Sequence, residues 1–166
     1  MVAETCIGCA LKTEKVDGPT HRYLGSSPGC WAKYGELLAK EYQHYQYMSV
    51  HNLTVDAYSL QHPGTENPQT ISSANVHLAS LYSYFELGKP VNELATLKKM
   101  MTNYKGQFTW LIPPDDQKAI TVAGVLTAET AAEHCDLVEQ WATYIFQQWK
   151  PHHPTIAKLL AIAYCD

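Results

Sequence analysis

A chain of 166 residues is long enough to bury a sizeable hydrophobic core, and its length predicts one domain that spans residues 1–166. Charged residues make up only 17% of the chain, and the net charge of −4 with no basic stripe argues against a nucleic-acid partner. No apolar run approaches the roughly 20 residues that a membrane-spanning helix needs, so we expect no membrane insertion.

The start of the chain, MVAETCIGCALK, has no basic segment followed by an apolar one, so it does not read as a signal peptide. We therefore expect a cytoplasmic protein in a reducing compartment. Structural disulfides are disfavoured in such a compartment. With five cysteines in the chain, a disulfide is nevertheless an alternative.

The first 30 residues combine ligand-type side chains with turn signals. Their ligand spacing is C-x2-C, then x11-H, then x8-C, which is the set Cys6, Cys9, His21 and Cys30. Thiolates and an imidazole within one glycine- and proline-containing segment suit tetrahedral Zn²⁺. Gly8 allows a tight turn between the paired cysteines. The pattern predicts a zinc-knuckle-like loop over residues 1–30, with His21 as the least certain ligand because a histidine from elsewhere in the fold can replace it.

A redox role for the C-x2-C pair is the main alternative to metal binding. Thioredoxin-type motifs follow a strand and open a helix within a βαβ unit. Only five residues precede Cys6, and no βαβ pattern follows, so this alternative is less favoured.

The helical pattern begins after this loop, at Trp31. The spacing i, i+3, i+6, i+7, i+11 places one apolar face on Trp31, Tyr34, Leu37, Leu38 and Tyr42. The pattern continues to Leu60, and the apolar phase drifts near residues 46–49, which leaves a break there open. The sequence His62-Pro63-Gly64 must end it, because a residue that precedes proline resists the α region.

Five further helices are expected along the rest of the chain. Gly88 ends the first of them, Pro90 opens the second, and Pro151 stops the longest. Their approximate ranges are 70–87, 90–104, 121–126, 127–150 and 154–165. Residues 106–116 are predicted to form a loop that packs against the helices. This pattern predicts an all-α fold, a helical bundle of about six helices over residues 31–166.

Several histidines and one aspartate fall at positions where a helical bundle can build a site. Asp56, His62 and His77 are expected to meet in a partly polar pocket between two antiparallel helices, because the loop over residues 64–69 is short. A carboxylate beside an imidazole fixes its tautomer, which suits general-base work or metal ligation. The same pair can equally be a buried structural hydrogen bond. A second metal site is a further alternative, with ligands from among His51, His62, His77, His134, His152 and His153.

The order of motifs C-x2-C, DGPTHRY, SSPGCW, LTVDAYSLQHPG and NVHL resembles a bacterial domain family of unknown function. The resemblance implies that these residues match the family pattern: Cys6, Cys9, His21, Cys30, Asp56, Tyr58, His62 and His77. It implies no activity. The scattered histidines are also similar to DinB-like metal-binding helical bundles, but this chain lacks their H-x3-H pair on a late helix.

Two functions from different classes follow from these observations. In the first, zinc is mainly structural, and the bundle recognises an unknown small molecule or protein. In the second, the protein is a metal-dependent enzyme, hydrolase-like, with Asp56, His62 and His77 as catalytic residues. A structural zinc site is closed by four protein ligands, whereas a catalytic site keeps a position open for water.

Overall fold

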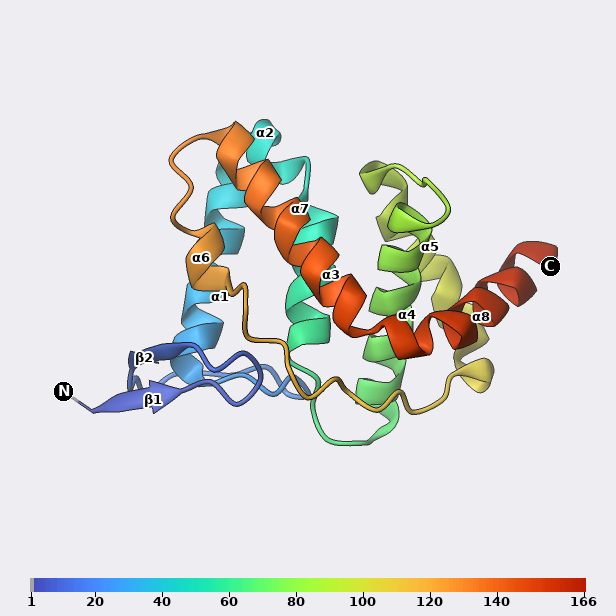
Figure 1. Cartoon of the computed structure of the whole chain (residues 1–166), viewed down its shortest axis with the longest axis horizontal. Coiled ribbons are helices and arrows are strands. Elements are labelled where there is room, and N and C mark those ends of the chain that lie inside the picture. The colour runs from blue at the N-terminus through green and yellow to red at the C-terminus, as the bar shows by residue number, and fades with distance from the viewer. Residues whose placement is uncertain (1) are drawn as a thin grey trace.

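The structure is a computed structural model, and it describes residues 2–166 (Figure 1). This part of the chain is mostly helical, as predicted, with eight α-helices and one two-stranded sheet. The helices are α1 (Pro28–Gln43), α2 (Tyr45–Met48), α3 (His51–Gln61), α4 (Pro68–Phe85), α5 (Leu94–Met101), α6 (Val122–Val125), α7 (Ala131–Gln148) and α8 (His153–Cys165). Short 3-10 turns are η1 (Val91–Glu93), η2 (Thr102–Gln107) and η3 (Lys150–His152). Within residues 2–166, no helix is both long and apolar enough to cross a membrane.

The N-terminal segment contains a small β-hairpin where only a loop was expected. Strands β1 (Ala3–Thr5) and β2 (Lys12–Glu14) pair antiparallel, with Ala3 opposite Glu14. The backbone N–H of Cys6 donates to the carbonyl of Leu11 at 2.8 Å, which extends the pairing into the turn. Strands of three residues are too short to produce a readable alternation of apolar and polar residues, so the sequence pattern did not reveal them.

Helix α1 begins three residues earlier than predicted, at Pro28. The side chain of Ser27 caps it by accepting a hydrogen bond from the N–H of Cys30, and proline is favoured in a first turn. Glu4 of β1 accepts a second bond, from the N–H of Gly29 at 2.7 Å. The hairpin is therefore tied to the start of α1.

Helix α3 lies in the middle of the molecule, between α1, α4 and α7 (Figure 1). Most of its residues are buried. It runs antiparallel to α1, and the rings of Tyr34 and Tyr58 stack between the two helices at 3.8 Å. It ends at Gln61, as the proline at position 63 predicted.

The predicted end of α4 before Gly88 is confirmed, whereas α7 begins at Ala131, four residues later than the start expected at residue 127. Two capping boxes set helix starts. Asn67 and Thr70 cap α4, and Thr130 and Glu133 cap α7. Beyond α4, Gly88 has a φ of +65°, a left-handed conformation that glycine adopts without strain.

The loop between η2 and α6 packs against the helices, as expected, and a buried amide pair holds it. Gln61 donates to the carbonyl oxygens of Gln117 and Ile120, and Gln117 donates back to the carbonyl of Leu60. The indole N–H groups of Trp141 and Trp149 donate to the two side-chain oxygens of this pair. Each buried polar group of the pair is thus satisfied.

Candidate functional site

Four buried ligand-type side chains converge where α1 begins and α3 ends. Cys6 and Cys9 come from the hairpin turn, Cys30 from the first turn of α1, and His62 from the residue that follows α3. Their ligand atoms all lie within 4.8 Å of one another. In residues 2–166, no other set of three or more cysteine, histidine or acidic side chains gathers this closely. We call this set the Cys3His cluster.

The distances within the Cys3His cluster fit one tetrahedral ion. Zn–S bonds of about 2.3 Å and a Zn–N bond of about 2.0 Å place tetrahedral ligand atoms roughly 3.5 to 3.8 Å apart. The sulfurs of Cys9 and Cys30 lie 3.7 Å apart, and Nε2 of His62 lies 3.4 Å from the sulfur of Cys30. A disulfide would bring two sulfurs to about 2 Å. All five cysteines, which lie within the described residues, are free.

The backbone sets the tautomer of His62. Its Nδ1 lies 2.8 Å from the carbonyl oxygen of Tyr58, which can only accept a hydrogen bond. Nδ1 therefore carries the proton and donates it, and the lone pair of Nε2 is directed at the cysteine sulfurs. Metal-binding histidines usually have such a partner on their second nitrogen.

The crowded sulfurs affect each other's ionisation strongly. Hydrogen bonds from Cys30 and then Cys9 hold the pKa of Cys6 far below its ordinary value. At Cys30, the contacts with Cys6 and Cys9, together with burial, raise the pKa instead. One negative charge is therefore favoured in the group, and further thiolates require a nearby cation.

Gly8 allows the hairpin turn to approach α3 closely. A Cβ at this position would lie 2.6 Å from Cδ2 of His62 and 2.9 Å from the carbonyl oxygens of Gln61 and Gly25. The backbone of His62 is held from the other side, because the N–H of Gly25 donates to its carbonyl at 2.9 Å. The position of this histidine thus depends on two segments of the N-terminal region.

The position of His21 requires a correction to the predicted ligand set. His21 is not part of the Cys3His cluster, and His62 stands with the three cysteines in its place. The ring of His21 lies against Tyr23 and Trp31, and its Nδ1 accepts a 3.4 Å hydrogen bond from the N–H of Tyr23. Burial, together with the charge of Arg22, lowers the pKa of His21.

Asp56 and His77 meet in the structure, but His62 is not with them, which corrects the predicted trio. Nδ1 of His77 donates to Oδ1 of Asp56 at 2.7 Å, and Nζ of Lys98 donates to the same oxygen at 2.8 Å. The hydroxyl of Ser80 donates to Oδ2. Helices α3, α4 and α5 each contribute to this group, which we call the Asp56 centre.

The charge of Asp56 is compensated within the protein. Its side chain is fully buried, and burial alone would raise its pKa. The ammonium of Lys98 and the hydrogen bond from His77 outweigh burial and hold the pKa of Asp56 below its usual value. The buried carboxylate is therefore ionised and forms a local ion pair.

A second buried carboxylate, Glu41, was not singled out by the sequence. Its Oε2 accepts from Nδ1 of His51 at 2.7 Å, and its Oε1 accepts from Nε2 of His134 at 3.0 Å and from the hydroxyl of Thr54. Burial would raise the pKa of Glu41, but these three contacts hold it below its usual value. Nδ1 of His134 is buried and has no hydrogen-bond partner in the described residues.

The remaining candidate histidines each have a backbone partner. Nε2 of His152 lies 2.8 Å from the carbonyl oxygen of Ile112, and Nε2 of His153 lies 3.0 Å from that of Phe146. Both belong to the junction between α7 and α8. The structure brings neither of them to the Cys3His cluster.

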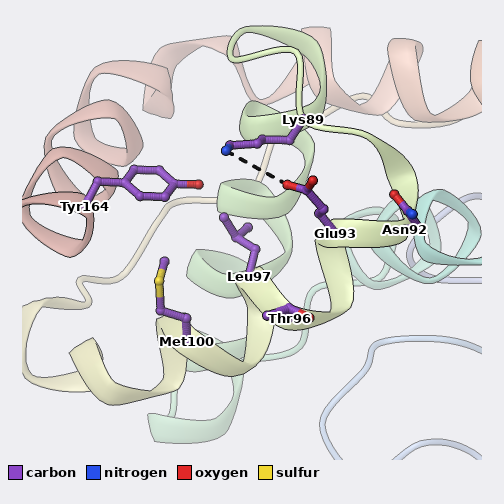
Figure 2. A pocket seen from close by; sticks show the side chains of 7 residues that line it. All are labelled: Lys89, Asn92, Glu93, Thr96, Leu97, Met100 and Tyr164. Atoms are coloured by element: carbon purple, nitrogen blue, oxygen red, sulfur yellow. Dashed lines mark ion pairs between the residues drawn. The ribbon is translucent and has the colours of Figure 1, made fainter.

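An open pocket of about 290 Å³ lies away from these polar groups, between η1, α5 and α8 (Figure 2). Leu97 and Met100 line it with apolar atoms, and Tyr164 projects into it from α8. Its charged residues, Lys89 and Glu93, pair with each other at 3.9 Å. No cysteine or histidine lines this pocket, so it offers no metal ligand of that kind.

These features define a class of protein: a mostly helical chain with a buried Cys3His cluster that could hold a metal ion. Residues 4–150 match the family of unknown function DUF5946, and the chain belongs to this family. The expected membership of a domain family of unknown function is thus confirmed. No curated protein and no solved structure matches the chain. The matched range contains the Cys3His cluster and both buried carboxylates.

Proposed function

We propose that the protein binds one Zn²⁺ through Cys6, Cys9, Cys30 and His62, and that this ion is structural. The observation that carries the proposal is the convergence of four buried ligand atoms, with the lone pair of Nε2 already directed at the sulfurs. Thiolate and imidazole donors in tetrahedral arrangement favour zinc over the harder cations, which prefer oxygen.

The burial of the cluster supports a structural role for the ion. All four side chains are buried, and four ligands are the number that closes a tetrahedral zinc site. A catalytic zinc keeps one position open for water or substrate. A metal-dependent hydrolase centred on these four residues is therefore disfavoured, and any chemistry belongs to another part of the fold.

Zinc would connect three segments that are distant in the sequence. The hairpin turn, the start of α1 and the end of α3 each supply at least one ligand. The helical body then serves recognition of a small molecule or a protein. A thiolate centre of this type persists where thiols stay reduced, which agrees with a cytoplasmic location.

Metal analysis of freshly purified, reduced protein tests the proposal. We expect about one equivalent of zinc per chain, with an X-ray absorption spectrum that shows three sulfur ligands and one nitrogen ligand. Cys30→Ser should abolish stoichiometric zinc, whereas Cys165→Ser, which changes an exposed cysteine outside the cluster, should retain it.

The choice of histidine is tested by a matched pair of variants. His62→Ala should lower zinc affinity by more than the roughly tenfold to hundredfold that the loss of an outer-shell partner costs, because it removes one of the four ligands themselves. His21→Ala should leave zinc content and affinity unchanged. Equal losses in both variants, or reduced wild-type protein that contains no zinc, would overturn the proposal.

A further inference from the structure

His77 presents one ring nitrogen to solvent while the other is fixed. Its Nδ1 donates to Asp56, and the side chain is 17% exposed. Nε2 has no hydrogen-bond partner in the described residues and is not buried. It is therefore accessible, and His77 lines an open pocket of about 390 Å³.

The tautomer of a neutral His77 follows from the Asp56 centre. An ionised carboxylate only accepts hydrogen bonds, so the proton resides on Nδ1. Nε2 then carries a lone pair. Lys98 already compensates the charge of Asp56, so the carboxylate does not require a protonated imidazole beside it. The pocket thus contains a hydrogen-bond acceptor of fixed direction.

The other polar side chains of this pocket include hydrogen-bond donors that complement this acceptor. No aspartate or glutamate lines it. Lys105 of η2 supplies an ammonium group, and hydroxyl groups come from Tyr23 of the N-terminal segment and from Ser72 and Ser73 of α4. The hydroxyl of Thr102, which also lines the pocket, already donates to the carbonyl oxygen of Lys99 at 2.6 Å. A ligand that satisfies both kinds of group needs acceptor oxygens with negative charge and also one O–H group.

We propose that this pocket binds a small oxyanion that retains a hydroxyl group, and that Nε2 of His77 accepts the hydrogen bond from that hydroxyl. Hydrogen phosphate and short hydroxycarboxylates share this chemistry. The anionic oxygens face Lys105 and the pocket hydroxyls. The site is independent of the Cys3His cluster, since the two sets have no residue in common.

Two matched pairs of probe anions test the proposal on the full-length, zinc-loaded protein. Phosphate is compared with sulfate, and glycolate with acetate, because the second anion of each pair lacks the O–H group. Measurements are made at pH 8. Binding is followed by the side-chain nitrogen resonances of His77 in NMR titrations, which also report its tautomer.

We expect the hydroxyl-bearing anion of at least one pair to bind about tenfold or more tightly than its partner, because an oxygen without a proton would face the imidazole lone pair. Discrimination by the phosphate pair alone identifies a phosphate-type ligand, and discrimination by the glycolate pair alone identifies a hydroxycarboxylate. Equal binding within both pairs, no saturable binding, or a neutral His77 with its proton on Nε2 would overturn the proposal.

Variants connect the binding to the pocket residues. Lys105→Ala should weaken binding of the preferred anion about tenfold, as expected for the loss of one charge-assisted hydrogen bond. The control Lys118→Ala changes a lysine that does not line the pocket and should have no effect. His77→Gln should remove the preference for the hydroxyl-bearing anion. Because Lys105 is exposed, its variant reports on binding even where His77→Gln folds poorly. Unchanged affinity in Lys105→Ala would contradict the assigned pocket.

Discussion

The N-terminal region, residues 2–27, and the helical body, residues 28–166, are held together by different means. In the described residues before Pro28, the only buried apolar side chains are Cys6 and Cys9. The helical body has a core of large side chains such as Trp141, Trp149 and Phe146. It also contains two buried carboxylates, each with its own partners inside the protein.

This difference shows where each region obtains its stability. A segment of fewer than 30 residues cannot bury enough apolar surface to fold by itself, and a metal ion commonly provides the missing stabilisation. The helical body has both an apolar core and compensated charges. We therefore expect the first region to depend on zinc and the second to depend on packing and on its internal ion pairs.

Removal of zinc should have the largest effect, and it should be confined to one region. Structural zinc contributes on the order of 10 kcal/mol in small zinc domains, so chelation should accelerate amide exchange in residues 2–27 by about 100-fold or more. Amides of α7 and α8 should keep their protection. Hydrogen exchange by mass spectrometry measures both regions at once. Equal acceleration of amide exchange in both regions would show that the N-terminal region does not depend on zinc more than the helical body does.

Glu41→Ala should produce the next largest effect, this time in the helical body. It leaves His134, which is fully buried, and His51 without their carboxylate partner. Leaving a buried hydrogen-bond donor without its acceptor costs roughly 1 to 3 kcal/mol, and His134, His51 and Thr54 would all lose the acceptor that Glu41 provides. Urea denaturation should show this loss of unfolding free energy, with zinc content unchanged.

Glu36→Ala is the matched control, because Glu36 forms only an exposed pair with Lys33. Its cost should stay below about 1 kcal/mol. If the two glutamate variants had similar stabilities, the buried network around Glu41 would not stabilise the helical body.

Gly8→Ala should have a smaller effect and should act on the contact between the two regions. The added Cβ would meet His62 and two backbone carbonyls at less than 3 Å, and such overpacking costs about 1 to 3 kcal/mol. Competition with a chromogenic chelator should reveal a zinc affinity lowered about tenfold. Gly18→Ala is the control, since nothing lies within 4 Å of its Cβ, and its zinc affinity should equal that of the wild type.

The smallest effect should appear only in acid and should report on Asp56. The pKa of Asp56 is lower in the folded protein than in the unfolded chain, where it is about 3.9. Ionisation of Asp56 therefore stabilises the fold at pH values above the unfolded pKa. This contribution is lost as the pH falls through the folded pKa. Asn at this position does not titrate. The stability difference between the wild type and Asp56→Asn should therefore be constant from about pH 5 to 7 and should narrow below about pH 4. A difference that stays constant down to pH 2 would contradict this assignment.

Much of the helical structure could be predicted because its signals are local. Pro63 and Gly88 limit helices through their own backbone restrictions, and the capping residue Thr130 precedes a clear apolar pattern. The proximity of Asp56 and His77 was also predictable, because a short loop joins their helices and places them at similar heights.

The fourth residue of the Cys3His cluster could not be predicted in the same way. His21 lies between the cysteines in the sequence, so spacing favoured it. His62 reaches Cys30 from 32 positions later only because α3 returns antiparallel to α1. That return depends on packing between helices, which local spacing does not contain.

Glu41 did leave a signal that was overlooked. Tyr34, Leu37 and Glu41 are spaced i, i+3, i+7 and are all buried on one face of α1. A carboxylate on an apolar stripe needs buried partners. The partners themselves, His51 and His134, lie 10 and 93 positions away, so their identity required the tertiary structure.

The positions of the polar contacts on α3 also restrict its rotation about its own axis. Each residue of an α-helix is rotated by about 100° from the one before it. His51 and His62, the residue that follows the helix, therefore point in directions only about 20° apart. Asp56 points about 140° away from His51. His51 contacts Glu41 near the end of α1, and His62 contacts Cys30 at its start. Asp56 contacts α4 and α5. A turn of α3 by a single residue would separate all three contacts at once. A single angle of rotation therefore satisfies the polar side chains that α3 buries.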